Sequence, residues 1–181
     1  MTRITVLKRE EMNAEQGKVF DTAKAAGNPV GGPYWAYVRY PRLMAASQEM
    51  GNCLREGPLS ARERQIAVLT TVRFWNAQYP WAAQARGSLQ AGVEQSIIDA
   101  INAQKEPDLP NPRERMAYTL AKELLANKGL SEATYKAAEK LFKTEELVSL
   151  VAAIGQFSMV SCTANAFDLT PTPEMTQKLM G

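Results

Sequence analysis

Residues 59–92 constrain the fold of this chain more than any other stretch, because they combine a defined helix start with a defined break. Ser60 and Glu63 form a capping box, in which the hydroxyl and the carboxylate each accept a backbone N–H at the helix start. Apolar side chains behind this cap repeat with the spacing of one helical face. Asn76 breaks the run, and a helix of small residues follows over 82–91. The stretch therefore predicts two consecutive helices joined by a short polar turn.

The rest of the chain repeats this helical pattern, and no segment shows the sustained alternation of apolar and polar residues that is typical of a strand. Caps, prolines at first helical positions and glycines after last ones delimit the other segments. The expected helices cover residues 13–26, 41–56, 60–74, 82–91, 93–101, 111–128, 131–142 and 144–167. We therefore predict an all-α protein, a bundle of about seven to eight helices in a single domain over 1–181. The last helix is apolar on most sides, which is typical of a helix that lies centrally or is covered by another subunit.

The composition limits what such a bundle can do. The net charge is +2 and no basic block occurs, so nucleic acid is not an expected partner. The longest apolar run, from Leu147 to Ile154, is too short to span a bilayer, and no apolar leader is present, so we expect a cytoplasmic protein without a membrane partner. Cys53 and Cys162 match no metal or redox spacing and are interpreted as buried thiols. Because the chain has no histidine and no carboxylates with metal-ligand spacing, we expect neither metal nor cofactor.

Several segments occur in the order and spacing of a known family. They are the central helix pair with its Tyr79-x-Trp81, and the segments MNAEQGKVFD, GPYWAYVRYP, RERMAYTLAKELL and LVSLVAAIGQFSMVSCTANAF followed by TPTP. The chain therefore resembles single-domain members of the carboxymuconolactone decarboxylase family, which includes the AhpD-like alkylhydroperoxidases. The resemblance covers nearly the whole chain and implies an AhpD-like helical bundle. It also implies a homo-oligomer, either a trimer or a trimer-based hexamer.

The positions that carry the family's peroxidase chemistry are replaced in this chain. Where those members have a glutamate, two cysteines and a histidine, this sequence has Gln65, Ala77, Pro80 and Gln84. A thiol peroxidase needs a thiolate nucleophile and a resolving thiol, and Ala77 and Pro80 supply neither. The decarboxylase members generally keep a histidine here as well. The resemblance therefore implies the fold and argues against a thiol peroxidase.

Three side chains of the central stretch are candidate catalytic residues. Without histidine, proton transfer near neutral pH falls to a carboxylate, lysine, cysteine or tyrosine with a shifted pKa. Glu63 or Tyr79 would move a proton, although the capping box accounts for Glu63 without any function and core packing is the commoner fate of a ring such as Tyr79. Gln84 would hold an oxyanion, because its amide donates hydrogen bonds but takes up no proton at neutral pH.

Five further side chains are candidates for substrate binding. Arg39 and Arg73 could each bind a carboxylate, and Arg73 could equally be a solvated surface charge. Tyr34 and its aromatic neighbours form either a lid over a pocket or a segment that covers the core. Gln65 and Trp81 add a polar and an aromatic group at the positions where the family's site lies.

Two features outside the central stretch are also open to interpretation. The loop 27–33 is rich in glycine and proline, but it lacks a following Lys-Ser/Thr and is interpreted as a turn rather than a phosphate-binding loop. Gln156, Ser158 and Asn165 interrupt the apolar last helix. Because buried polar groups need partners, these side chains face either a pocket or a subunit interface.

Two classes of function remain. The first is an enzyme of carboxymuconolactone decarboxylase type that acts on a small carboxylated ring-fission product or lactone, by lyase, isomerase or hydrolase chemistry through an enolate-like intermediate. The second is a non-catalytic oligomer that binds a small acid and has lost the site. The polar and aromatic side chains at the replaced positions favour the enzyme, because a decayed site tends to fill with apolar side chains. The expected partners are a small-molecule carboxylate and further copies of the chain.

Overall fold

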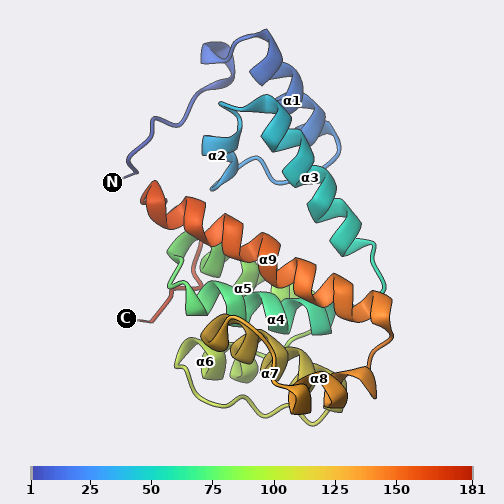
Figure 1. The fold of residues 1–181 in the computed structure, drawn as a ribbon. Helices are drawn as coiled ribbons and strands as arrows, with labels where there is room; N and C mark the ends of the chain where they lie inside the picture. Colours follow the sequence, from blue (N-terminus) through green and yellow to red (C-terminus); the bar gives the residue numbers. More distant parts are fainter. Residues whose placement is uncertain (1, 181) are drawn as a thin grey trace.

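The computed structural model describes residues 2–180, and this part of the chain is all-helical, without a strand (Figure 1). The all-α prediction is confirmed. The helices are α1 (Ala14–Ala25), α2 (Tyr34–Tyr37), α3 (Pro41–Arg55), α4 (Ala61–Phe74), α5 (Gln78–Gln90), α6 (Gln95–Asn102), α7 (Pro112–Asn127), α8 (Glu132–Glu139) and α9 (Thr144–Ala166), preceded by a 3₁₀ turn at Arg9–Glu11. The count exceeds the seven to eight expected because of α2, a single turn in the aromatic segment that is too short to produce a helical pattern.

Local capping chemistry determines where several of these helices begin. Asn13 accepts a hydrogen bond from the Gln16 backbone N–H at 2.9 Å, and Ser60 accepts one from the Glu63 N–H at 3.2 Å. Helix α5 begins at Gln78, four residues before the expected start at residue 82. Pro80 occupies its first turn, where a backbone N–H has no partner inside the helix, so the proline does not exclude helical structure there.

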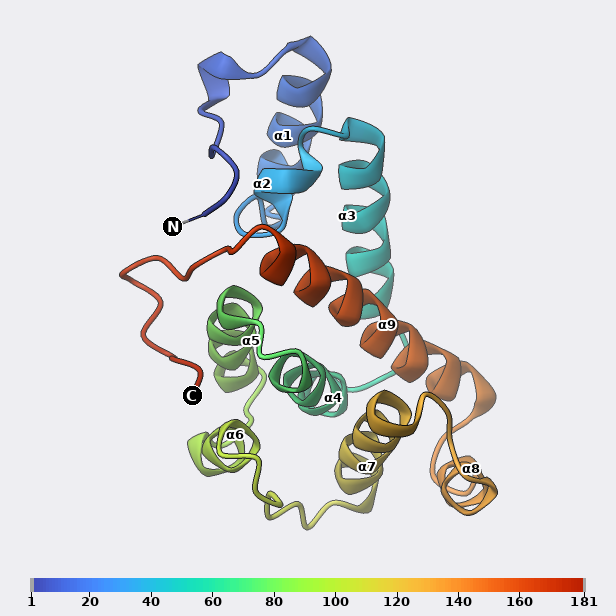
Figure 2. The same cartoon turned by 60° about the vertical axis from the view of Figure 1, so that its left-hand side comes forward.

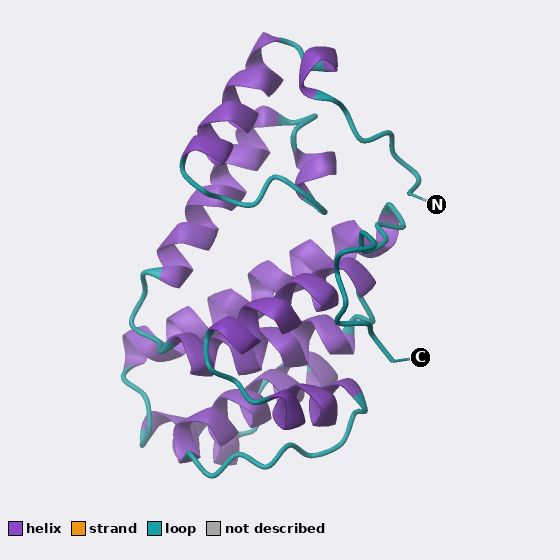
Figure 3. Ribbon diagram, turned by 180° about the vertical axis from the view of Figure 1, so that it is seen from behind, coloured by secondary structure: helices purple, strands orange, loops and turns teal. Residues whose placement is uncertain are grey.

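Helix α9 lies at the centre of the molecule. Figure 2 shows α1–α3 on one side of it and α4–α8 on the other, and α9 contacts α3, α4, α5, α7 and α8. In the view from behind, the two termini lie on the same side of the molecule (Figure 3). The Arg3 N–H donates to the Phe167 carbonyl at 2.9 Å, which attaches the N-terminal lead-in to the end of α9. The N-terminal helices and the larger helical bundle are therefore joined through one shared element.

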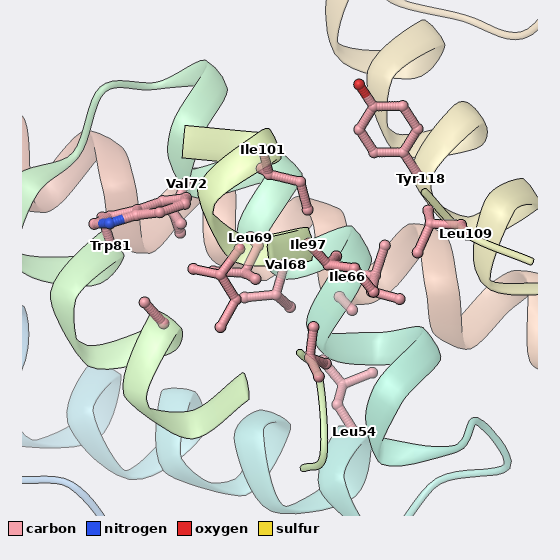
Figure 4. Close-up of a cluster of buried hydrophobic side chains, with 14 residues drawn as sticks. Leu54, Ile66, Val68, Leu69, Val72, Trp81, Ile97, Ile101, Leu109 and Tyr118 are labelled. Atoms are coloured by element: carbon pink, nitrogen blue, oxygen red, sulfur yellow. The ribbon is translucent and has the colours of Figure 1, made fainter. Parts of the chain in front are cut away.

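The core between α4, α5, α6 and α9 is apolar and closely packed. Figure 4 shows its side chains, among which Ile66, Leu69 and Trp81 are completely buried. Deleting a side chain of this size from a core costs about 2–5 kcal/mol. This core holds α4 and α5 in a fixed relation, and their other faces are free to line a cavity.

The apolar character of α9 extends beyond the Leu147–Ile154 run. The helix is 23 residues long with a mean hydropathy of 1.7, so by length and composition alone it could cross a membrane. Of its most apolar window, 39% is buried inside the molecule, and the buried side chains include Ser149, Gln156 and Ser161. Helix α9 is therefore partly buried against the rest of the molecule.

Candidate active site

A cavity of about 750 Å³ lies where the N-terminal helices meet the larger bundle. Its wall is formed by the loop before α2, the end of α3, the start of α4, one face of α5 and the middle of α9. Four of the side chains singled out from the sequence line it together, namely Tyr34, Gln65, Tyr79 and Gln84. They come from three separate helices, so the fold brings them together.

Tyr79 is held against the glycine-rich loop before α2. A Cβ added at Gly31 would lie 2.7 Å from the Tyr79 hydroxyl, and one added at Gly32 would lie 2.2 Å from its ring. Gly32 also has φ +62°, which side chains with a Cβ rarely adopt. The Trp35 ring packs edge-on against Tyr79, with centroids 5.3 Å apart. The two glycines therefore make room for the phenol, which lies half-buried in the cavity wall.

Tyr79, Gln65 and Gln84 contribute polar groups to this wall. Burial raises the pKa of Tyr79, partly offset by the charge of Arg86, so the phenol keeps its proton at neutral pH and can donate it in a hydrogen bond. Gln65 and Gln84 lie on α4 and α5, and the Gln65 amide nitrogen lies 2.9 Å from the point that a Cβ at Gly87 would occupy. Within residues 2–180, none of the three side chains makes a hydrogen bond. They are positioned to bind an oxygen atom of a ligand.

Glu63 is not part of this wall. Its carboxylate accepts hydrogen bonds from the Ser60 N–H at 3.0 Å and from the Arg113 guanidinium at 2.5 Å. Burial would raise the pKa of Glu63, but Arg113 and Ser60 together lower it below its usual value. Arg113 also binds Glu146 at 2.8 Å. The Glu63 carboxylate thus caps α4 and belongs to an ion-pair cluster with Arg113 and Glu146.

The other three side chains singled out for binding also lie outside the cavity wall. Arg39 donates to the backbone carbonyls of Trp35 and Thr5, at 2.6 Å each. Arg73 is 7% exposed and donates to the Asn102 carbonyl at 2.7 Å. Trp81, expected at the site, is instead completely buried in the apolar core.

Two arginines that the sequence analysis did not single out do line the cavity, Arg55 at the end of α3 and Arg64 in the first turn of α4. Arg64 begins a row at helical spacing that continues with Val68 and Thr71, both completely buried. This row was the one sequence signal that could have indicated that Arg64 points inward. Gln156 of α9, one of the polar side chains expected to face a pocket or a subunit interface, also lines the cavity.

Neither cysteine belongs to the cavity, and both are exposed, so the expectation of buried thiols was wrong. Cys162 lies on α9, whose sequence is apolar on most sides while only part of its surface is covered by the rest of the chain. Among the described residues, no three His, Cys, Asp or Glu side chains are grouped closely enough to hold a metal ion.

Comparisons with known proteins relate this geometry to a family and a fold. The sequence model of the carboxymuconolactone decarboxylase family matches residues 41–123, which include α3, α4 and α5. No curated protein sequence matches significantly.

Solved structures resemble the chain over nearly its whole length. An uncharacterized peroxidase-related protein from Silicibacter sp. TM1040 is 18% identical with a TM-score of 0.79, covering 99% of this chain and 96% of that one. An uncharacterized peroxidase-related protein with an alkylhydroperoxidase AhpD core, from Ralstonia eutropha JMP134, is 18% identical with a TM-score of 0.77, covering 96% of this chain and 94% of that one. The debrominase Bmp8 is 16% identical with a TM-score of 0.74, covering 97% and 95%, and a cysteine-to-alanine variant of it was solved with 2,3,4-tribromopyrrole. At these identities the likeness establishes a shared AhpD-like fold.

Proposed function

We propose that this chain, which belongs to the carboxymuconolactone decarboxylase family and has the AhpD-like fold, is an enzyme that acts on a small carboxylated ring-fission product or lactone. The observation that carries the proposal is the group of Gln65, Tyr79 and Gln84, three polar side chains that line one cavity without partners in the described chain. All three side chains are half-buried, so their unpaired polar groups remain accessible to a ligand in the cavity.

The chemistry that fits these groups is stabilisation of an enolate. Lyase, isomerase and lactone-hydrolysing reactions on such compounds share an intermediate with a developing oxyanion. Amide N–H groups and a protonated phenol are suitable donors to that oxyanion. Tyr79 keeps its proton at neutral pH because burial raises its pKa, so it would act as the donor or general acid. Among the described residues that line the cavity, Glu56 is the one that carries a carboxylate.

The cavity also suits a small ring. Tyr34 and Phe157 contribute aromatic surface to a wall that encloses about 750 Å³, a typical volume for a small-molecule site. A debrominase of the same fold has been solved with a brominated pyrrole, so halogenated pyrroles belong among the compounds to test. A thiol peroxidase is disfavoured, since the cysteine positions hold Ala77 and Pro80 and neither existing cysteine lines the cavity.

We also propose that the protein works as a cytoplasmic homo-oligomer, a trimer or hexamer, without a nucleic-acid or membrane partner or a cofactor. The support for self-association is the apolar surface that α9 exposes in the protomer. Val148, Val151 and Met159 are 63%, 42% and 37% exposed. A second copy of the chain would remove these side chains from water.

A non-catalytic protein that binds a small acid is the second candidate function. It is favoured by the titratable groups of the wall, since the chain has no histidine and the pKa of Tyr79 is raised rather than brought toward neutrality. Such a wall recognises a ligand more readily than it cycles protons. Binding is therefore common to both candidates, and turnover separates them.

The test combines a thermal-shift screen with a turnover assay on muconates, carboxylated lactones, pyrones, aromatic acids and halogenated pyrroles. We expect Tyr79→Phe to lower kcat/KM by about 10²–10³-fold on a compound that is turned over, as removal of one oxyanion donor does elsewhere. Tyr40→Phe is the matched control, because the Tyr40 side chain is 61% exposed and lies outside the wall. Binding without turnover of any compound would select the non-catalytic candidate. Unchanged turnover in both Tyr79→Phe and Gln84→Leu would show that these roles are wrongly assigned.

A further inference from the structure

We infer that Arg55 and Arg64 form a carboxylate-binding subsite of the cavity, in which the two guanidinium groups hold one acidic group of the ligand. The inference rests on the proposed function only in taking this cavity as the ligand site. It assigns the carboxylate of the ligand to these two residues, whereas Gln65, Tyr79 and Gln84 would bind the oxygen on which the oxyanion develops.

Arg64 is fixed by the end of α3. Its Nη1 donates to the backbone carbonyls of Leu54 and Arg55, both at 3.3 Å. These carbonyls belong to the C-terminal turn of the helix, where a cation is favoured. The Nε and Nη2 groups make no hydrogen bond with residues 2–180. Arg64 is therefore held in place by one nitrogen and retains free donors beside the cavity.

Arg55 is oriented from two sides. Its Nη2 donates to Asn28 in the loop before α2, at 2.8 Å, and also to Asn52 one turn back on α3. Its Nη1 lies 3.3 Å from the point that a Cβ at Gly51 would occupy, and the Gln156 amide nitrogen lies 3.4 Å from the same point. The absence of a side chain at Gly51 thus lets the guanidinium lie against the helix beside Gln156. All four of these neighbours line the cavity.

Gln156 adds an oriented polar group to this part of the wall. It is 5% exposed, and its amide nitrogen donates to the Ser47 carbonyl at 3.3 Å. This bond fixes which way the amide faces. Within the described chain its carbonyl oxygen accepts no hydrogen bond, so it is available to a donor on the ligand, such as a protonated acid or a hydroxyl.

The charges of Arg55 and Arg64 are not neutralised by ion pairs within residues 2–180. Arg62 binds Glu94 and Glu114, and Arg113 binds Glu63 and Glu146. In the part of the chain that the structure describes, Arg55 and Arg64 form no such ion pair.

The environment of Arg64 makes an anion favourable there. Burial, together with the neighbouring charge of Arg55, lowers the pKa of Arg64. The two arginines outnumber Glu56, the one carboxylate among the described wall residues, so the wall disfavours a cationic ligand and favours an anion that touches both guanidinium groups. A carboxylate offers two oxygens to the fork of a guanidinium, and inorganic phosphate shares that chemistry.

The test compares benzoate with benzamide and with inorganic phosphate, at constant ionic strength, by titration calorimetry on the full chain. Benzoate and benzamide have the same ring and differ in charge. We expect the wild type to prefer benzoate to both other compounds. Arg64→Gln should weaken benzoate binding about 10- to 100-fold, the usual effect of losing a charged hydrogen-bond donor, and leave benzamide unchanged. Arg55→Gln should act in the same direction, and it provides a second variant on an exposed residue should Arg64→Gln not fold.

The matched control is Arg42→Gln, since Arg42 is an exposed arginine of the same helix as Arg55 and lies outside this cavity. Equal binding of benzoate and benzamide by the wild type would overturn the inference, as would wild-type benzoate affinity in both Arg64→Gln and Arg55→Gln. Tighter binding of phosphate than of benzoate would overturn the assignment to a carboxylate. If the two arginine variants lose the preference for benzoate but the wild type turns over no compound, the subsite is supported and the proposed catalysis is rejected. If the wild type turns over a charged compound and neither arginine variant changes that turnover, the catalysis is supported and the subsite is rejected.

Discussion

At the scale of single residues, the fate of each charged side chain depends on its partners rather than on its type. Glu63 illustrates this, because its carboxylate accepts hydrogen bonds from the Ser60 backbone and from Arg113 at once. The same carboxyl group could serve as an acid in a solvated cleft. Here it is 5% exposed and its pKa is lowered, which makes it a structural anion.

This environment gives a pH-dependent stability. A carboxyl group whose folded-state pKa lies below its usual value of 4.5 stabilises the fold above that pH. The contribution is lost as the pH falls through the folded-state pKa. We expect Glu63→Gln to lower the free energy of unfolding by about 1–2 kcal/mol at pH 7, since one charged hydrogen-bonding partner is lost.

Urea unfolding of the wild type and Glu63→Gln at pH 7 and at pH 3 measures this difference. The gap between the two proteins should narrow at the lower pH, where the wild-type carboxylate becomes protonated. Glu132→Gln is the control, because that glutamate is exposed and pairs only with Lys136. A gap that stays constant between the two pH values would contradict the role given to the charge.

At the scale of helices, Gly51 has two opposite effects in α3. It lowers the stability of the helix, and it leaves room for the Arg55 guanidinium beside the cavity. Glycine inside a helix costs about 1 kcal/mol relative to alanine. A Cβ at this position would lie 3.3 Å from the Arg55 guanidinium and 3.4 Å from the Gln156 amide, both ends of side chains that can move. We expect Gly51→Ala to raise the free energy of unfolding by up to about 1 kcal/mol and to weaken benzoate binding several-fold.

Urea unfolding and benzoate calorimetry on the same variant measure both effects. Benzamide provides the internal control, because its affinity should not respond to a displaced guanidinium. A variant that is more stable and binds benzoate as the wild type does would show that the position of Arg55 over Gly51 is unimportant for the ligand.

The helices show which parts of the fold could be predicted from sequence and which could not. The starts after Asn13 and Ser60 were predictable because a cap is a contact between residues three apart. The start of α5 was not, since proline is compatible with a first turn as well as with a loop. Segments of one turn, such as α2, give no periodic signal.

The site was predictable to a similar extent. Gln65, Tyr79 and Gln84 could be assigned to one region because they lie on two consecutive helices of a recognisable family pattern, and they do line one cavity. The partners of Arg39 and Arg73 are backbone carbonyls from other segments, which only the folded chain identifies. Arg55 and Arg64 were missed for a different reason, because a charged residue near a helix end usually faces solvent.

At the scale of the whole molecule, α9 has two different surfaces. One side contributes Gln156 and Phe157 to the cavity, and another exposes Val148, Val151 and Met159. We expect the wild type to have a mass of three or six times 20.0 kDa in light scattering after size exclusion. Val151→Glu should shift it to smaller species, because a buried unpaired charge disfavours association.

Val6→Glu is the matched control, as Val6 is also a valine with similar exposure, 43%, in the N-terminal lead-in. Circular dichroism of both variants verifies that the protomer still folds. A wild-type mass of one protomer would exclude the oligomer. An oligomer that Val151→Glu leaves intact would move the contact to another surface.

The separation between the apolar core and the cavity wall has a consequence for how this protein can change. Trp81, Ile66 and Leu69 hold α4 and α5 together, whereas Gln65 and Gln84 on the same helices face the cavity. Substituting a cavity residue such as Gln65 or Gln84 removes few packing contacts, so it changes the free energy of unfolding little. Chemistry and architecture are thus encoded by different positions of the same two helices. Evolution or protein design can therefore substitute the cavity residues of α4 and α5 while the core residues stay the same.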